Sequence, residues 1–432
     1  MEVRDPVHGT IPIQDEVVPI ITHEFFQRLR SIKQLGFSEY VFPGGTHTRY
    51  IHSLGVMHIG DMAFKKIFKR KLRNAEVQRM YQTFKLACML HDIGHAPLSH
   101  ASEFMMPKLR ELKLSSKFTQ GTDKSTQATH EHYTIKIITD SSFNDSFKNV
   151  HAKYGVLSEA IASLILGENV VSGYFDFEGT NYFPLLHQLV SSELDCDRMD
   201  YLLRDSYFCG VSYGNYDLNW LIDNLTFAVE DNKAYLGIFE RAVLAFDDFL
   251  LSRYHMFIMV YFHYRSVCLE KLLLQYFKTS HGEYTITANI EDYIHHNDHH
   301  LIKIMKNSEN AYAQAVIKNQ IPEKIFEAYN DPQKQQLGKI EDYLLGEDIE
   351  FIKSSSTGRL SKYYGAQEQN HGDFPIKVVR SSRQGTQLSS SNIFDATDLF
   401  EKFSKSHAIG RLYCDIDGLS PDQRGQLNKL LI

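Results

Sequence analysis

The sequence predicts a mostly α-helical protein with one short β-hairpin and a small α/β region at its C-terminal end. Apolar residues recur at steps of three and four through most of the first 280 residues, as on the buried face of a helix. Two short strand-like runs, at 225–229 and 234–239, flank a polar turn at 230–233 and predict the hairpin. Beyond about residue 346, strand-like runs replace most of the helical spacing.

The N-terminal elements are expected to be a turn, a short strand and two helices. The sequence Asp5-Pro6-Val7-His8-Gly9 predicts the turn, and residues 10–13 predict the extended piece. A helical pattern runs from 17 to about 36, and Gly44-Gly45 predicts a loop. A second helix is expected from about residue 46.

The third major helix contains residues 86–91, where an apolar run ends in His91, Asp92 and His95. A buried helix rarely ends in such polar groups unless a ligand occupies that end. We expect Pro97 to open a further helix, because proline suits the first helical position.

Further along, one strong helix is expected over 185–203 and a long apolar helix over 246–277. A Ser-rich run at 354–358 is typical of a linker, and strands are expected at 374–379 and 410–414, with a helix at 396–403 between them. The expected units are an enzymatic core at 1–280, a helical extension at 281–345 and a small α/β region at 346–432.

The composition is that of a globular protein, with 43% hydrophobic and 23% charged residues among 432. A net charge of -7 argues against broad binding to nucleic acids. Five cysteines without a CxxC pair fit reduced thiols better than a disulfide framework. The N-terminus has no apolar signal-peptide region, and the helix at 246–277 is too polar to span a bilayer, so we expect a cytoplasmic protein with no membrane partner.

Histidines and aspartates on three of these helices predict a metal site. Divalent metals accept mixed imidazole and carboxylate ligands, with water completing the coordination. His91 and Asp92 are adjacent, so two more ligands must come from elsewhere. The candidates are His52 and one carboxylate among Asp195, Asp197 and Asp200. Buried carboxylates are costly without a cation, and although each residue alone would more often be solvated, the set together predicts a site.

The ordered set His52, His91-Asp92 and Asp197 resembles the H…HD…D signature of the HD-domain phosphohydrolase superfamily. Longer motifs resemble its dNTP triphosphohydrolase branch, which includes dGTPase-like enzymes. These motifs are residues 5–9, 27–36, 52–56, 91–100 and 200–205. The resemblance covers roughly residues 2–280 and implies an HD-domain helical core and one divalent metal per active site, with Mn, Mg, Fe, Ni and Zn as the candidates. His52, His91, Asp92 and Asp197 would be its ligands.

The resemblance also implies roles for residues around the metal. The proton-handling set is His100, Glu103 and His130, and the spacing of His100 and Glu103 independently places them on one helical face. The substrate-binding set is Gln34, Arg49, His95, Asp195, Arg198, Tyr201, Asp205, Arg253, Tyr261 and His263. Within it, His95 and Arg49 would contact phosphate, Gln34 and Asp205 the 3′-hydroxyl, and Tyr201 the sugar ring.

The expected reaction converts a dNTP into deoxynucleoside and tripolyphosphate. One alternative is an HD phosphohydrolase that acts on another nucleotide or phosphate ester. Another is a catalytically weak nucleotide-sensing protein, since Ile258 and Met259 stand where mammalian family members have two arginines. By analogy with the family, we expect a homo-oligomer (a dimer or a tetramer). Family members bind activator nucleotides between subunits, but Met1 and Thr22 stand where mammalian members have a Lys and an Asp that contact a guanine activator, so the resemblance leaves a nucleotide activator open.

Overall fold

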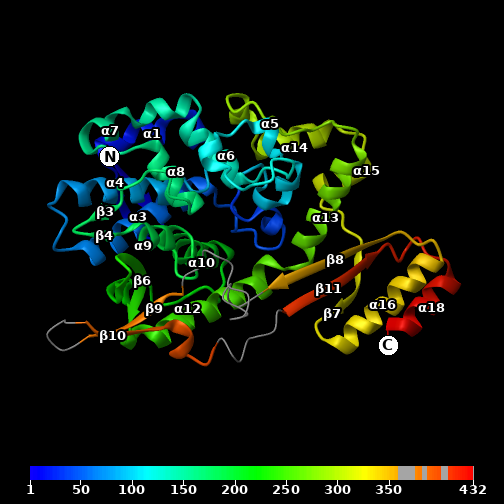
Figure 1. The fold of residues 1–432 in the computed structure, drawn as a ribbon. Coiled ribbons are helices and arrows are strands. Elements are labelled where there is room, and N and C mark those ends of the chain that lie inside the picture. Colours follow the sequence, from blue (N-terminus) through cyan, green and yellow to red (C-terminus); the bar gives the residue numbers. More distant parts are fainter. Residues whose placement is uncertain (359–374, 382–386, 400–406, 432) are drawn as a thin grey trace.

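The computed structural model describes residues 1–358, 375–381, 387–399 and 407–431. A large helical body has small sheets at its edge and at its C-terminal end (Figure 1). This arrangement confirms the predicted fold class. The α-helices are α1 Val18–Thr22, α2 Glu24–Arg28, α3 Arg49–Phe68, α4 Ala75–Leu90, α5 Leu109–Leu112, α6 His130–Thr139, α7 Lys148–Tyr154, α8 Ser158–Leu166, α9 Phe183–Val190, α10 Cys196–Cys209, α11 Leu218–Asp223, α12 Val243–Met256, α13 Tyr264–Thr279, α14 Asp298–Asn307, α15 Ala311–Ile317, α16 Asp331–Gly346 and α18 Pro421–Leu431.

The helical pattern from residue 17 is divided into short pieces rather than one helix. α1 ends where His23 adopts an extended conformation, with φ -68° and ψ 144°. The same residue caps α2, because its imidazole accepts a hydrogen bond from Phe25 N. The apolar spacing therefore identified the buried face correctly but missed the break.

α3 and α4 pack at the centre of the body and are buried along most of their length. α4 ends at Leu90, so His91 and Asp92 follow the last helical turn, as the sequence predicts. Gly55 on α3 permits a close approach of α10, since a Cβ there would lie 1.9 Å from Asp200 Oδ1. Gly94 has the same role beside α6, where a Cβ would lie 2.2 Å from the His130 carbonyl.

The expected helix over 185–203 is wrong in one respect, because it is two helices. α9 ends at Val190, and α10 starts at Cys196 with Asp195 as its N-cap. The Asp195 carboxylate accepts hydrogen bonds from Arg198 N at 2.8 Å and Ser192 N at 2.9 Å. An apolar period does not reveal such a cap when polar residues on both sides also suit a helix. The break places Asp197 in the first turn of α10.

The predicted hairpin is confirmed by strands β5 (Leu225–Glu230) and β6 (Lys233–Phe239), which pair antiparallel. β6 also pairs in parallel with β9 (Lys377–Ser381), and β9 pairs with β10 (Gln387–Asn392), so part of the C-terminal region extends a core sheet. Short strands β3 (Asp176–Phe177) and β4 (Thr180–Asn181) complete this sheet. At the N-terminus, β1 (Glu2–Asp5) and β2 (Gly9–Pro12) form a second hairpin around the predicted turn.

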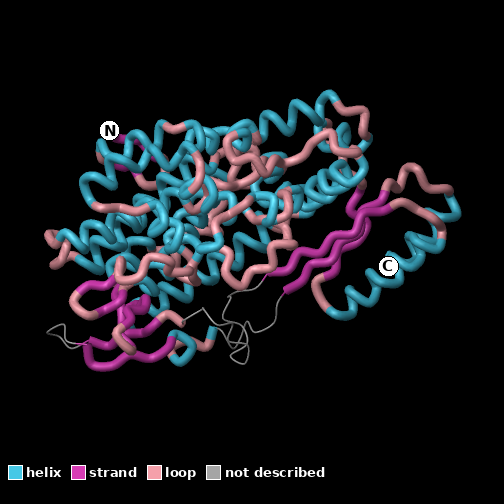
Figure 2. Tube along the Cα trace, turned by 45° about the horizontal axis from the view of Figure 1, so that its top comes forward, coloured by secondary structure: helices cyan, strands magenta, loops and turns pink. Residues whose placement is uncertain are grey.

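A three-stranded antiparallel sheet lies at the C-terminal end, in the order β7 (Glu323–Ala328), β11 (His407–Cys414) and β8 (Phe351–Gly358), beside α16 and α18 (Figures 1 and 2). The Ser-rich run expected to be a linker is therefore a strand. Ser354 and Ser356 are buried, and pairing with β11 satisfies their backbone groups. Residues 400–403, the second half of the helix expected at 396–403, lie outside the described residues.

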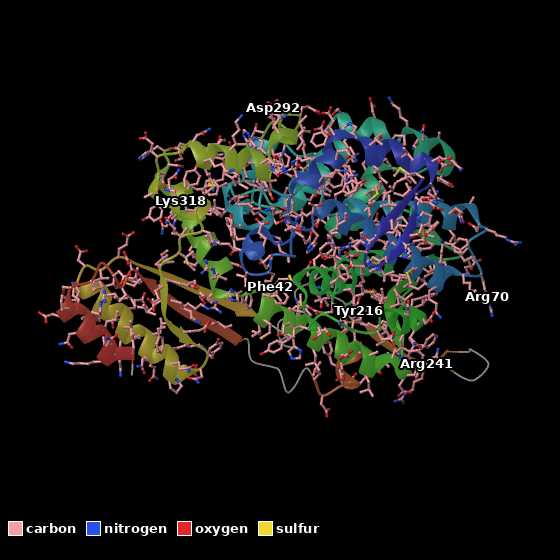
Figure 3. All side chains as sticks on the ribbon, turned by 180° about the vertical axis from the view of Figure 1, so that it is seen from behind. Phe42, Arg70, Tyr216, Arg241, Asp292 and Lys318 are labelled. Carbon is pink, nitrogen blue, oxygen red and sulfur yellow. The ribbon has the colours of Figure 1, made fainter. Side chains whose placement is uncertain are left out.

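A helical segment connects the body to this sheet, and Figure 3 labels Asp292 and Lys318 near its two ends. Over the described ranges, no helix has the length and apolar character that crossing a membrane requires.

Candidate metal and nucleotide site

Four predicted ligands come together where α3, the end of α4 and the start of α10 meet. The ligand atoms of His52, His91 and Asp197 lie within 4.8 Å of one another. Asp197 Oδ1 lies 3.0 Å from His52 Nε2 and 3.5 Å from His91 Nε2. Asp92 faces both imidazoles, at 3.5 Å from His52 and 3.3 Å from His91, and is paired with Arg49.

The two imidazoles are oriented so that their Nε2 atoms face the carboxylates. His52 Nδ1 lies 2.7 Å from Asp200 Oδ2, and His91 Nδ1 lies 2.8 Å from the Cys88 carbonyl. Because both partners only accept, each Nδ1 bears the proton and each Nε2 presents a lone pair. Both Nε2 atoms are buried, and each faces carboxylate oxygens without a well-aligned hydrogen bond. A divalent cation between them and Asp197 fits this donor set.

The electrostatics of the cluster also suit a cation. Burial disfavours the charged form of His52, but the carboxylates of Asp197 and Asp200 raise its pKa to about 9. Burial likewise opposes ionisation of Asp92, yet Arg49, His91 and His95 hold its pKa well below the usual range. The carboxylates therefore stay ionised, and a metal would replace the protons that they otherwise draw onto the histidines.

A buried ion-pair network supports His52 from behind. Asp200 contacts His8 Nε2 at 2.6 Å and accepts hydrogen bonds from Arg204 at 2.7 and 2.9 Å. Arg204 also donates to Asp5 Oδ2 at 2.8 Å, so the β1–β2 turn is tied to α10. The motif 5–9 contributed to the family resemblance, but sequence reasoning assigned no role to Asp5, His8 or Arg204 and offered Asp200 only as a candidate ligand.

The predicted proton-handling residues form a second cluster beside the metal ligands. Glu103 accepts from His130 Nδ1 at 2.6 Å and lies 3.0 Å from His100 Nδ1. His100 and Glu103 lie on a 3₁₀ helix, η4 (Ser99–Met105), rather than on the α-helix expected after Pro97. Burial opposes ionisation of Glu103, but the two histidines lower its pKa. One carboxylate thus fixes both imidazole rings.

His95 links the two clusters. Its Nε2 lies 3.2 Å from Asp92 Oδ1, and its ring stacks on His130 with a centroid distance of 3.9 Å. Burial, together with Arg49 and His130, holds its pKa well below the usual range, so the ring is neutral. The single ring proton of neutral His95 is therefore directed from Nε2 toward Asp92 Oδ1.

A cavity of about 440 Å³ opens onto both clusters. Of the predicted site residues, those that line it are Gln34, Arg49, His91, Asp92, His95, His100, His130, Asp195, Asp197, Arg198, Tyr201, Asp205 and Tyr261. Arg253 and His263 do not line it. His263 instead caps α13, where its ring accepts from Arg265 N at 3.3 Å.

Arg253 acts on the cavity indirectly, through a residue that sequence reasoning missed. Glu193 is fully buried and lies 3.0 Å from Arg253 and 3.1 Å from Arg198. Burial works against the charge on Arg198, but Asp195 and Glu193 raise its pKa, so it stays positive. Glu193 therefore positions the arginine that lines the cavity.

The predicted sugar-binding residues lie together on the cavity wall. Asp205 accepts a hydrogen bond from Tyr261 at 2.7 Å, and its other oxygen lies 2.7 Å from His47 Nε2. Gln34 Oε1 is buried without a partner in the described structure, so it is available to accept from a ligand hydroxyl. Tyr261 ends a π-helical turn, η8 (Phe257–Tyr261), that divides the long helix expected over 246–277. Such turns are frequent at functional sites.

The segment 293–298 holds the turn that follows the metal ligands. Tyr293 donates to the Gly94 carbonyl, and Arg28 joins the carbonyls of His95 and His296. Asp298 accepts from Leu98 N at 2.6 Å and from Lys33 N at 2.9 Å. Leu98 has a positive φ of 57°, a strained conformation for a branched residue. The histidine-rich run at 295–300 thus contributes a backbone carbonyl and a carboxylate that hold this turn.

Comparisons with known proteins agree with this geometry. The family model described as "HD domain" matches residues 49–204. Uncharacterized protein MG461 of Mycoplasma genitalium is 32% identical over 278 residues, which cover 62% of this chain and 57% of that protein. The deoxynucleoside triphosphate triphosphohydrolase SAMHD1 homolog of Dictyostelium discoideum is 28% identical over 328 residues, 73% of this chain and 57% of that one.

The chain thus spans 57% of the length of these two relatives. A crystal structure of a hypothetical protein from Aquifex aeolicus has a TM-score of 0.74 at 26% identity and covers 99% of both chains. The H…HD…D residues all lie within the matched segment 49–204. Residues 49–204 of the chain thus match the HD domain family.

Proposed function

We propose that this protein is a metal-dependent phosphohydrolase that cleaves a dNTP into deoxynucleoside and tripolyphosphate. The observation that most supports this function is that one cavity is lined both by three of the four proposed metal ligands, His91, Asp92 and Asp197, and by the imidazole pair that Glu103 holds. Hydrolysis of a phosphate ester needs charge neutralisation and proton transfer, and these two groups match the two needs. The relative from Dictyostelium, a deoxynucleoside triphosphate triphosphohydrolase by name, supports the choice of substrate.

The phosphate end of the substrate would lie against the metal cluster. A divalent cation held by His52, His91, Asp92 and Asp197 would supply Lewis-acid stabilisation of charge on the phosphate. Arg198 adds a fixed positive charge, and guanidinium groups bind phosphate oxygens in pairs. His95 would contact the phosphate end with a neutral ring, because burial, Arg49 and His130 disfavour its protonation, and its Nε2 lies 3.2 Å from Asp92 Oδ1.

Proton transfer would fall to His130 and His100. Their Nδ1 atoms are occupied by Glu103, so Nε2 is the atom of each ring that can exchange a proton with the reacting oxygen. The ionised Glu103 stabilises the imidazolium form that follows proton uptake. His130 is buried more deeply than His100, whose side chain is 67% exposed, so His100 is better placed to exchange protons with solvent.

The sugar would contact Tyr201, Asp205 and Gln34. Gln34 Oε1 lacks a partner among the described residues, and Asp205 has carboxylate oxygens that a hydroxyl could share with Tyr261. The Tyr201 and Tyr261 rings lie 6.2 Å apart edge to face and close this part of the cavity. A deoxyribose fits against such a wall better than a ribose, whose 2′-hydroxyl adds bulk.

Product analysis by chromatography tests the function. Each dNTP, alone and in pairs, is incubated with the protein and Mn²⁺ or Mg²⁺. We expect deoxynucleoside and tripolyphosphate in equal amounts, and at least a 100-fold loss of rate in Asp197→Ala. Deoxynucleoside monophosphate as the product would indicate another phosphohydrolase, and binding without turnover would indicate a nucleotide sensor. Asp217→Asn, an exposed N-cap on α11, serves as the control for expression and folding.

A further inference from the structure

Glu270 is a cavity-lining carboxylate that the proposed reaction does not use. It lies on α13, is exposed and lines the cavity. The other carboxylates of the cavity wall each have a partner, as Asp205 has Tyr261 and Asp195 has the start of its own helix. Within the described residues, Glu270 has no hydrogen bond or ion pair. An unpaired carboxylate that faces a ligand cavity is available to accept hydrogen bonds from the ligand.

The position of Glu270 relates it to the part of the ligand beyond the sugar. α13 packs against η4 and against a second 3₁₀ helix, η3 (Gly36–Tyr40), which begins two residues after Gln34. Phe277, two turns after Glu270 on the same face of α13, contacts Phe104 at the end of η4 with a centroid distance of 5.6 Å. The metal cluster fixes the phosphate end, and Gln34 and Tyr201 line the sugar part. Among the remaining lining residues, Leu35 and Gly36 follow Gln34 directly, so we place the base against the wall of Leu35, Gly36 and Glu270.

The chemistry of a carboxylate distinguishes the Watson–Crick edges of the four common bases. Its two oxygens only accept hydrogen bonds, so they suit a base with two adjacent donors. Guanine has such a pair, a ring N–H next to an exocyclic amino group, whereas adenine, cytosine and thymine each place an acceptor beside any donor on that edge. We propose that Glu270 is a specificity-determining residue that accepts hydrogen bonds from the guanine edge of dGTP.

The surroundings of Glu270 make its charge responsive to such a ligand. The cavity walls crowd Glu270 on one side and raise its pKa to about 7, although the side chain keeps access to solvent on the other side, and the neighbouring Lys271 opposes the shift. The charged and titratable groups on the elements packed against α13 are engaged elsewhere: Glu39 with Lys33, His100 with Glu103, Tyr312 with Glu350 and Lys353 with Glu341. Tyr40, next to Glu39, keeps its proton because burial raises its pKa. Guanine binding would favour the ionised carboxylate, because only that form accepts both hydrogen bonds.

The test compares dGTP with dATP in wild type, Glu270→Gln and Glu131→Gln. Glu131 lines the same cavity from α6, so its variant is a matched loss of one charge. We expect the ratio of kcat/KM for dGTP over dATP to fall about tenfold or more in Glu270→Gln and to stay unchanged in Glu131→Gln. In wild type the same ratio should rise between pH 6 and 8. Titration of the shared catalytic groups affects both substrates and cancels in the ratio.

This inference depends on the proposed function, so binding is measured separately by calorimetry with dGTPαS and dATPαS. Guanine-selective binding that Glu270→Gln abolishes, without turnover of any dNTP, would refute the hydrolase proposal and support the role of Glu270. Turnover or binding with a ratio that Glu270→Gln leaves unchanged would overturn the role of Glu270 alone. Absence of both turnover and nucleotide binding in the wild type would overturn both.

Discussion

Replacing Asp200 with asparagine tests whether the buried network behind His52 sets the strength of metal binding. Asp200 is fully buried and uses its two oxygens for His52 Nδ1, His8 and Arg204. An asparagine keeps one oxygen and replaces the other with an amino group, which can only donate. If this group faces His52, the ring must move its proton to Nε2, and the lone pair needed for the metal is lost.

The expected effect on metal affinity is a loss of about 10- to 100-fold, the usual cost of removing the partner that orients a ligating histidine, or about 1.4 to 2.7 kcal/mol. Folding stability falls as well, by about 3 kcal/mol, because Arg204 stays buried with only Asp5 to neutralise it. Breaking a buried ion pair usually costs about 3 to 5 kcal/mol, and the lower end of this range applies because Asp5 still pairs with Arg204.

Titration of Mn²⁺ by calorimetry measures the affinity, and circular dichroism checks that the variant is folded. Asp61→Asn is the matched control. Asp61 lies on α3, the helix that carries His52, and pairs with Tyr81 and Lys65 away from the metal cluster. His8→Gln is a milder variant that keeps Asp200 and should weaken binding only a few-fold. Folded Asp200→Asn protein that binds Mn²⁺ as tightly as Asp61→Asn would refute the reasoning.

Three further predictions concern the second cluster, the phosphate side and the turn. The folded-state pKa of Glu103 is lowered, so the stability that this carboxylate contributes is present above its unfolded pKa of about 4.3 and is lost as the pH falls below that value. Thermal melts should therefore show that Glu103→Gln is less sensitive to acid than wild type. Equal sensitivity of the two proteins would contradict this prediction. Glu193→Gln should lower kcat/KM about 10- to 100-fold while leaving Mn²⁺ affinity unchanged, because it removes the carboxylate that Arg253 and Arg198 share but contacts no metal ligand. Steady-state kinetics and metal titration of the same variant measure the two quantities. Asp298→Ala should cost about 2 to 4 kcal/mol of unfolding free energy in urea, because two backbone N–H groups lose their acceptor, whereas Asp292→Ala on the nearby surface should cost far less.

The metal cluster was predictable from the sequence because each ligand type appears in a motif whose spacing has chemical meaning. His91 and Asp92 end an apolar helix, and Asp197 lies in an acidic run that would be costly to bury without a cation. The hairpin was predictable for a similar reason, since its two strands are joined by a short polar turn.

Residues that act through another residue were not predictable. Glu193 stands between Ser192 and Leu194, and nothing local shows that it will meet Arg253, 60 positions away. The Ser-rich strand β8 was missed because its stability comes from pairing with β11, about 50 residues later. Asp298 was not predictable because its partners, Leu98 and Lys33, lie 200 and 265 positions away. In each case the missing information was a long-range contact.

The central claim is that His52, His91, Asp92 and Asp197 together hold one divalent cation, and counting the bound metal tests it most directly. Calorimetric titration of metal-stripped protein with Mn²⁺ should give one site per chain, and this site should disappear in Asp197→Ala while remaining in Asp61→Asn. A stoichiometry of zero, or a site that persists unchanged in folded Asp197→Ala protein, would contradict the account.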